Sequence, residues 1–213
     1  MHRIRITFAK FGKARWIGNL DLHRTWARIL RRAGVPIAYS QGYNPQPRIQ
    51  LASALPLGTI SECEILGVWM LDVIVIDTLM KELKPDLPIG IKVLEIEEVG
   101  LKEKSLQSRL RAAEYVIELE EHIGTSLLQD MIDNLLSMEA IVRRRRGRDY
   151  DMRPLIEFMD VVDEECVPEK IFMRLSACPG ATGRPSEVLE HMGIVAKNIN
   201  RTGLLFVDND DRR

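Results

Sequence analysis

The feature that most restricts the fold of this chain is the order of its apolar periodicities. Residues 2–8 alternate apolar and polar side chains, which is typical of a half-buried strand. In residues 19–33 the apolar side chains recur at helical spacing, and Gly34 is placed to end that helix. Further patterns complete this half of the chain, with strands at 49–54 and 62–71, a helix at 76–84 and a strand at 91–99.

This order, strand-helix-strand-strand-helix-strand, is that of a ferredoxin-like domain. The second half repeats it less regularly and has one strand more than the repeat requires. A length of 213 residues fits two domains of this size. We therefore expect fold class α+β, with two ferredoxin-like domains in tandem at residues 1–101 and 113–213, joined by a charged linker at residues 102–112.

The helix ends also carry predictions. Asn19 is expected to cap the first helix, whose apolar stripe should place Trp26 against the sheet. Ser126 with Gln129 forms a candidate capping box for the helix that follows the linker. Pro185 is expected to begin the last helix, and Gly193 to end it.

Charge is distributed very unevenly along the chain. The first 58 residues contain ten Lys and Arg against one acid, Asp21, so this segment has a net charge of +9. The whole chain has a net charge of -1, so the remaining residues are strongly acidic. Such separation favours a basic face for a polyanion. The alternative is that the basic half packs against the acidic half.

Within the basic half, Arg24, Arg28 and Arg31 fall on one row of the predicted helix. A loop rich in Pro, Gly and Asn follows, and its tyrosines could stack on bases while its amides read base edges. The alternative is that the tyrosines are core or turn residues. Asp21 is expected to pair with Arg24 or Arg28 across a helical turn.

A second basic run lies at residues 143–148, in the acidic half. Alternation along a strand sends neighbouring arginines to opposite faces, so this run cannot form one flat patch. We favour an arm that contacts phosphates over a solvated hairpin tip, because clustered arginines repel one another without an anionic partner. The candidate nucleic-acid-binding residues are Lys13, Arg15, His23, Arg24, Arg28, Arg31, Arg32, Tyr39, Gln41, Tyr43, Asn44, Arg48, Arg144 and Arg146.

Signals for catalysis are weak. Nucleophile, phosphate-loop and zinc-protease motifs are missing, so no catalytic residue is assigned. The three cysteines are far apart, which predicts reduced thiols, no metal site and no cofactor. No apolar run reaches 18 residues and the N-terminus alternates, so we expect a cytoplasmic protein without a membrane partner.

The chain resembles the radical-SAM-linked proteins, a family defined by domain of unknown function 2344. The resemblance rests on residues 11–23 and 31–48, and continues through 55–58, 151–154, 184–189 and 201–206. It implies a radical SAM protein as partner, which would supply the iron-sulfur chemistry. Because this chain lacks a CxxxCxxC motif, it resembles a free-standing member.

Three functions remain open at this point. The first is a non-catalytic accessory protein of a radical SAM enzyme that binds RNA or a ribosome-associated substrate. The second is a metal-independent endoribonuclease, similar at the level of fold to CRISPR repeat-processing enzymes, with His23 acting beside Lys13 or Tyr43. The third is a module whose basic face docks onto a protein alone.

Overall fold

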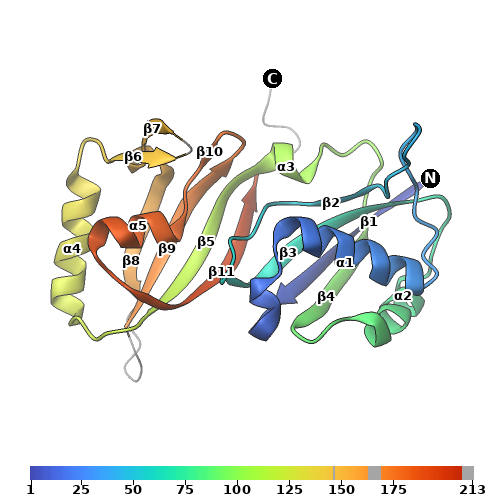
Figure 1. Ribbon diagram of the computed structural model, residues 1–213, viewed down its shortest axis with the longest axis horizontal. Helices are drawn as coiled ribbons and strands as arrows, with labels where there is room; N and C mark the ends of the chain where they lie inside the picture. The colour runs from blue at the N-terminus through green and yellow to red at the C-terminus, as the bar shows by residue number, and fades with distance from the viewer. Residues whose placement is uncertain (146, 163–168, 208–213) are drawn as a thin grey trace. The chain divides into compact units, whose positions relative to one another are not determined.

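The computed structural model describes residues 1–145, 147–162 and 169–207. It divides into two compact units, which we call unit 1 (residues 1–109 with 207) and unit 2 (residues 110–206). Each unit combines an antiparallel sheet with helices, so the predicted α+β class is confirmed (Figure 1).

The sheet of unit 1 has the strand order β4-β1-β3-β2, and every pair is antiparallel. In register, Ile6 of the central strand β1 faces Leu66 on one side and Ile96 on the other. The elements follow the predicted order strand-helix-strand-strand-helix-strand. The strands are β1 (His2–Lys10), β2 (Ile49–Leu51), β3 (Ile60–Met70) and β4 (Ile91–Glu98).

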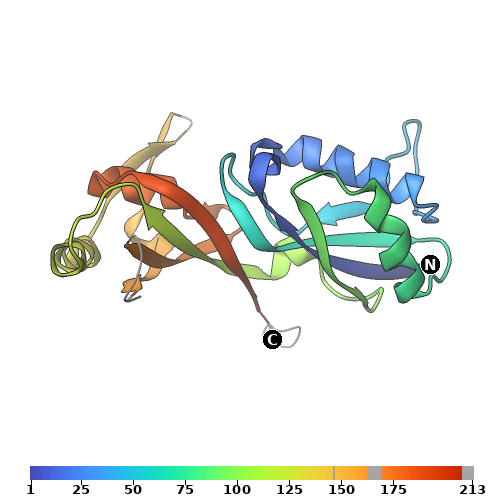
Figure 2. The same cartoon turned by 90° about the horizontal axis from the view of Figure 1, so that it is seen from below.

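Two α-helices, α1 (Asn19–Arg32) and α2 (Ile76–Leu83), complete the core of unit 1. Figure 2 shows α1 lying along the strands of this unit. Trp26 of α1 is 0% exposed and meets Phe8 of β1 edge to face, with ring centroids 4.8 Å apart. The predicted burial of Trp26 is therefore confirmed. Short 3-10 helices occur at η1 (Gly12–Trp16) and η2 (Lys84–Asp86).

The predicted end of α1 is right, and the predicted beginning is wrong by one residue. Gly34 follows the helix with φ of 68°, the left-handed conformation that glycine adopts without strain. At the other end, the capping position is Gly18, which has no side chain to accept a hydrogen bond. Asn19 is already the first helical residue, and its side chain does not cap the helix.

Unit 2 repeats the arrangement with two additions. Its sheet has the antiparallel order β8-β9-β5-β11. The short strand β10 also pairs with β9, and β6 with β7 forms a separate hairpin. The elements are β5 (Leu110–Leu119), α4 (Thr125–Ser137), β6 (Val142–Arg145), β7 (Arg148–Asp151), η3 (Arg153–Leu155), β8 (Ile156–Val162), β9 (Lys170–Cys178), β10 (Ala181–Thr182), α5 (Pro185–Met192) and β11 (Ala196–Phe206).

The beginning of α4 differs from the prediction. Its capping position is Gly124 rather than Ser126. Glycine has no side chain that could accept a hydrogen bond from the helix. Instead the carboxylate of Glu169 accepts hydrogen bonds from the backbone N–H groups of Ile123 and Gly124, at 2.7 and 2.8 Å. An anion at a helix N-terminus satisfies orphan donors and the helix dipole. The predicted bounds of α5 are confirmed, and Gly193 ends it with φ of 71°.

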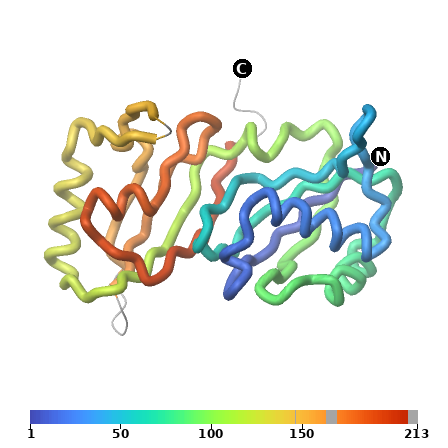
Figure 3. The backbone as a smooth tube through the Cα atoms, in the orientation of Figure 1, coloured from blue at the N-terminus to red at the C-terminus, as the bar shows by residue number. Residues whose placement is uncertain are grey.

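The segment predicted as a linker is structured. Residues 102–112 contain the four-residue helix α3 (Leu106–Arg109) and the beginning of β5. Figure 3 follows the backbone through this region without a break in the described chain. Over the described ranges, every helix is too short or too polar to cross a membrane.

Candidate nucleic-acid interface

The outer face of α1 carries a row of cations. Arg24, Arg28 and Arg31 are exposed, and we call these three residues the α1 ridge. They occupy one side of the helix because they are spaced by four and three residues. The opposite side buries Leu22, Trp26, Ile29 and Leu30 in the core. The exposure of the α1 ridge is therefore a consequence of the amphipathic pattern.

Few acids neutralise this ridge. Arg24 donates to Asp21 over 3.1 Å, as predicted, but both side chains are more than two-thirds exposed. Such exposed ion pairs contribute little to stability, so the Arg24 guanidinium can readily leave Asp21 for a phosphate. Arg32, beside the ridge, lies 3.7 Å from Asp86. Within the described residues, Arg28 and Arg31 have no acidic partner. The ridge therefore retains most of its positive charge.

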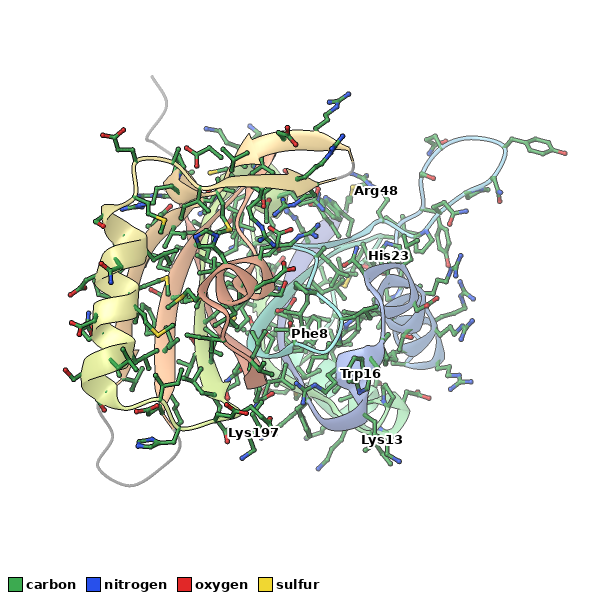
Figure 4. All side chains as sticks on the ribbon, turned by 60° about the vertical axis from the view of Figure 1, so that its left-hand side comes forward. Phe8, Lys13, Trp16, His23, Arg48 and Lys197 are labelled. Atoms are coloured by element: carbon green, nitrogen blue, oxygen red, sulfur yellow. The ribbon has the colours of Figure 1, made fainter. Side chains whose placement is uncertain are left out.

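The loop from Tyr39 to Arg48 extends away from the sheet (Figure 4). Its base is fixed by backbone hydrogen bonds, since Arg48 donates to Ala38 over 2.8 Å and Ala38 donates to Trp69 over 2.7 Å. Ser40 Oγ accepts a hydrogen bond from the backbone N–H of Gln46 at 2.9 Å, and this bond links the two sides of the loop. Five of the predicted contact residues are exposed here, namely Tyr39, Gln41, Tyr43, Asn44 and Arg48.

Tyr43 is the clearest case among them. Its side chain is as exposed as in an extended chain, with a relative accessibility of 108%. Tyr43 is therefore not a core residue, but it lies in the bend at residues 41–44, so the other half of the alternative, a turn residue, stands. Tyr39 is 41% exposed and forms a β-bridge with Pro47 near the base of the loop. A fixed base and an exposed aromatic tip suit stacking on an unpaired base.

Arg48 lies at the junction between the loop and β2. Its guanidinium sits 5.3 Å from the indole centroid of Trp69, and Arg3 stacks on the same indole at 4.4 Å. Arg48 is exposed, so its charge faces solvent, whereas Arg3 is buried. Arg48 is thus positioned by Trp69 and remains accessible to a phosphate.

His23 does not belong to the α1 ridge. It is half-buried, and its Nε2 lies 3.3 Å from the backbone oxygen of Ile49 at the beginning of β2. Figure 4 shows His23 and Lys13 well apart on this side of unit 1. His23 therefore connects α1 to β2, and the structure does not bring it together with Lys13.

Arg15 has a structural role that its sequence context did not reveal. Its Nε donates to the carbonyl of Gly58 over 2.6 Å, and the N–H of Gly58 donates back to the Arg15 carbonyl over 3.0 Å. Nearby, the buried Lys10 donates to the carbonyl of Ile17 over 2.8 Å. These bonds fix the turn that presents Lys13 and Trp16, which are both exposed.

The second basic run lies in the hairpin formed by β6 and β7. As the alternation predicts, Arg143 and Arg145 point to one face, where they form ion pairs with Glu190 and Glu187 of α5. Arg144 points away, is exposed, and lies 3.7 Å from Asp149. Arg146 falls outside the described residues. Arg144 and Arg148 are thus the exposed members of this run in the described chain, and either could meet a phosphate.

A compact polar cluster holds that hairpin on α5. Tyr150 donates its hydroxyl to Glu187 over 2.6 Å, and Arg145 stacks on the Tyr150 ring at 4.6 Å. Burial alone would raise the pKa of the Glu187 carboxyl, but hydrogen bonds from Arg145 and Tyr150 hold that pKa below its ordinary value. Burial and Glu187 raise the pKa of Tyr150. The cluster is therefore ionic and structural.

No metal centre is evident in the part of the chain that the structure describes, where no three His, Cys, Asp or Glu side chains are suitably grouped. Of the described cysteines, Cys63 and Cys178 do not form a disulfide. Cys166 falls outside the described residues.

Comparison with solved structures gives a likeness in fold. A chain of the crystal structure of a Cbf5–Nop10–Gar1 complex is 11% identical with a TM-score of 0.53, and the match covers 94% of this chain and 48% of that chain. A chain of an H/ACA RNP bound to a substrate RNA containing 2′-deoxyuridine is 10% identical, with a TM-score of 0.45 and coverage of 86% and 43%. The chain thus spans about half the length of these relatives.

Curated proteins provide no match. The family comparison is decisive for membership, because one model matches residues 3–185, which cover nearly all of unit 1 and unit 2 as far as the beginning of α5. Its description is "Uncharacterized protein conserved in bacteria". The chain belongs to this family, DUF2344.

Proposed function

We propose that unit 1 binds single-stranded RNA through the α1 ridge and the loop from Tyr39 to Arg48. The observation that carries the proposal is the row of three exposed arginines, of which Arg28 and Arg31 have no acidic partner in the described chain. From Arg24 to Arg31 the helix rises about 10 Å, which gives a row of charge along which a sugar-phosphate chain can run.

The loop supports RNA rather than a generic polyanion. Phosphates account for the arginines but do not require exposed aromatic and amide side chains. Tyr43 offers a ring for an unpaired base, while Gln41 and Asn44 offer donors and acceptors for base edges. Double-stranded RNA hides its bases, so this combination suits a single strand.

On the resemblance described above, we further propose that this binding serves a radical SAM enzyme, with this chain presenting RNA or a ribosome-associated substrate. In this proposal the chain itself carries out no chemistry. Retention of the RNA by the radical SAM enzyme only when this chain is present supports it. Cleavage of the RNA in EDTA that disappears in His23→Ala contradicts it and favours the endoribonuclease.

Both units also support a single structural plan. We propose that each is a ferredoxin-like domain, since the orders β4-β1-β3-β2 and β8-β9-β5-β11 are equivalent once the β6–β7 hairpin and β10 are set aside. Unit 2 lacks an exposed arginine row on its helices α4 and α5, so we assign the RNA site to unit 1.

The test is the binding of a fluorescein-labelled oligouridylate to a triple variant, Arg24→Gln, Arg28→Gln and Arg31→Gln. A matched control is Lys81→Gln, Lys92→Gln and Lys102→Gln, which removes the same charge from exposed positions of unit 1 outside the ridge. We expect the ridge variant to lose most affinity at low salt and the control to lose little. Equal losses of affinity in the two variants would show that only the total charge matters, and would contradict a binding site at the α1 ridge.

A further inference from the structure

An exposed indole lies at the N-terminal end of the α1 ridge. Trp16 is the last residue of η1, three positions before α1 begins, and its side chain is 67% exposed. Figure 4 shows it at the surface of unit 1. Tryptophan is usually extensively buried, so such exposure calls for an explanation.

Most of the indole is exposed, and its six-membered ring lies against a neighbouring turn. A Cβ placed on Gly58 would come within 3.2 Å of Trp16 Cζ3 and 3.3 Å of Cη2, so the ring rests directly on the Gly58 backbone. Gly58 has φ of 81°, which other residues rarely adopt. The position thus requires glycine for both conformation and space.

The support is rigid because hydrogen bonds connect the two segments. Arg15 and Gly58 exchange two hydrogen bonds, at 2.6 and 3.0 Å, and the buried Lys10 holds the carbonyl of Ile17. These bonds hold the backbone on both sides of Trp16. The ring is therefore positioned before any ligand arrives, which reduces the entropy lost on binding.

The surroundings of the indole are apolar and basic. Leu20 and Leu57 are exposed by 74% and 63%, and Leu20 is four residues before Arg24, so it begins the row that the α1 ridge continues. Lys13 is exposed, and the Arg15 guanidinium lies 5.9 Å from the indole centroid. A ligand that matches this surface has an apolar planar part attached to an anionic chain.

We propose that Trp16 is a stacking platform for an unpaired base of the RNA strand that the α1 ridge binds. This inference rests on the proposed function and adds a subsite to it. The exposed part of the ring takes the base, and Arg24 is the first ridge cation that the following phosphates meet. Stacking of this kind tolerates any base, because every base has a π-face.

The experiment compares Trp16→Ala and Trp16→Phe with the wild type, using the labelled oligouridylate over a range of salt concentrations. Loss of the platform should weaken binding about 5- to 100-fold at every salt concentration. The slope of log affinity against log salt should stay unchanged, because Trp16 carries no charge. Trp16→Phe should recover most of the affinity, since a phenyl ring also stacks.

A second variant keeps the indole and removes its support. Gly58→Ala places a Cβ against the ring and a left-handed φ on alanine, so it should weaken RNA binding in the same direction. Gly180→Ala is the matched control, because Gly180 in unit 2 has a similar φ of 84° and a Cβ there would meet no atom within 4 Å, so it should leave RNA binding unchanged. Circular dichroism of each variant confirms that the fold is retained.

The outcomes separate the platform from the proposed function. Wild-type affinity in Trp16→Ala, with affinity lost in the ridge variant, would overturn the platform and leave RNA binding in place. Absence of RNA binding by the wild type at low salt would overturn both. Two results together would support the platform. Trp16→Ala should lose affinity for the RNA, and the RNA should quench indole fluorescence in the wild type but not in Trp16→Phe.

Discussion

At the scale of single residues, the two tryptophans near α1 have opposite tasks. Trp26 is 0% exposed and fills the space between α1 and β1, whereas Trp16 is 67% exposed. Burial of a large aromatic side chain is a major source of stability, and its exposure provides none. The same residue type thus supports the fold at one position and offers a contact surface at the other.

These tasks predict different costs for the same change. Trp26→Ala should lower the free energy of unfolding by about 3–5 kcal/mol, because it leaves a cavity in the core. Trp16→Ala should lower it by about 1 kcal/mol or less, as expected of an exposed position. Denaturant melts measure both values. A loss below about 1 kcal/mol for Trp26→Ala would place that side chain outside the core and contradict the packing of α1.

A cluster of arginines in unit 1 gives a second prediction at this scale. Arg5 and Arg109 donate to the carboxylate of Glu103, and buried Arg3 donates to the Glu103 backbone oxygen over 2.9 Å. Burial lowers the pKa of Arg3, and the neighbouring Arg5 acts in the same direction. Glu103 is thus a central counterion for three cations, of which Arg5 and Arg109 are only 14% exposed.

Glu103→Gln should therefore lower the free energy of unfolding by about 1–3 kcal/mol, because it removes the partly buried carboxylate that Arg5 and Arg109 share. Glu97→Gln is the matched control, since Glu97 also pairs with Arg5 but is 50% exposed. That control should cost less than about 1 kcal/mol. Chemical denaturation measures the free energy of unfolding of both variants. Equal losses of stability would mean that Glu103 is not the central counterion.

At the scale of elements, patterns carried by one segment were predictable and contacts between distant segments were not. The apolar stripe of α1 predicted its buried side and its exposed arginines, and Gly34 predicted its end. The beginning of α4 was missed because its cap is Glu169, a residue 45 positions away from Gly124. The platform of Trp16 was missed for the same reason, since its support, Gly58, comes from a distant turn.

The hairpin of β6 and β7 illustrates both outcomes. Alternation predicted that neighbouring arginines face opposite ways, and the structure confirms it. The sequence could not show that α5 supplies Glu187 and Glu190 to one of those faces. With these carboxylates present, Arg143 and Arg145 need no nucleic acid to offset their charge.

Stability at this hairpin should depend on pH. The folded-state pKa of Glu187 lies below its unfolded value, so the ionised carboxylate stabilises the fold above about pH 4.5 and loses this contribution as the pH falls through the folded pKa. Glu187→Gln should cost about 1–3 kcal/mol at pH 7, and the difference from the wild type should shrink below about pH 4.

Glu190→Gln on the same helix is the control for this prediction. Glu190 pairs with Arg143 but its side chain is 70% exposed, so the cost should stay below about 1 kcal/mol. Urea melts between about pH 3 and pH 7, the range in which carboxyl groups titrate, give both profiles. A constant difference between Glu187→Gln and the wild type at all pH values would contradict the ionic cluster.

At the scale of the whole molecule, a near-neutral total conceals the charge that matters for binding. The chain has a net charge of -1, yet its first 58 residues carry +9. Local positive potential attracts a polyanion and raises the association rate, and the net charge of the chain does not report it. The exposed α1 ridge belongs to this segment. RNA binding by unit 1 should therefore depend strongly on ionic strength.

The salt dependence of RNA binding tests this claim most directly. If the ridge and its neighbours contact about five phosphates of a single strand, log affinity should fall with log salt at a slope near -3.5. Between about 50 and 200 mM salt the wild type should then lose roughly a hundredfold in affinity.

The Arg24, Arg28 and Arg31 to Gln variant should reduce that slope by about two units, with nearly unchanged thermal stability because exposed charges contribute little to folding. The slope of the oligouridylate titration, measured for both proteins, is the deciding quantity. A slope reduced by about two units is expected if the α1 ridge contacts the phosphates. A wild-type slope in the variant, or no binding by the wild type at low salt, would contradict it and assign the basic face to a protein partner.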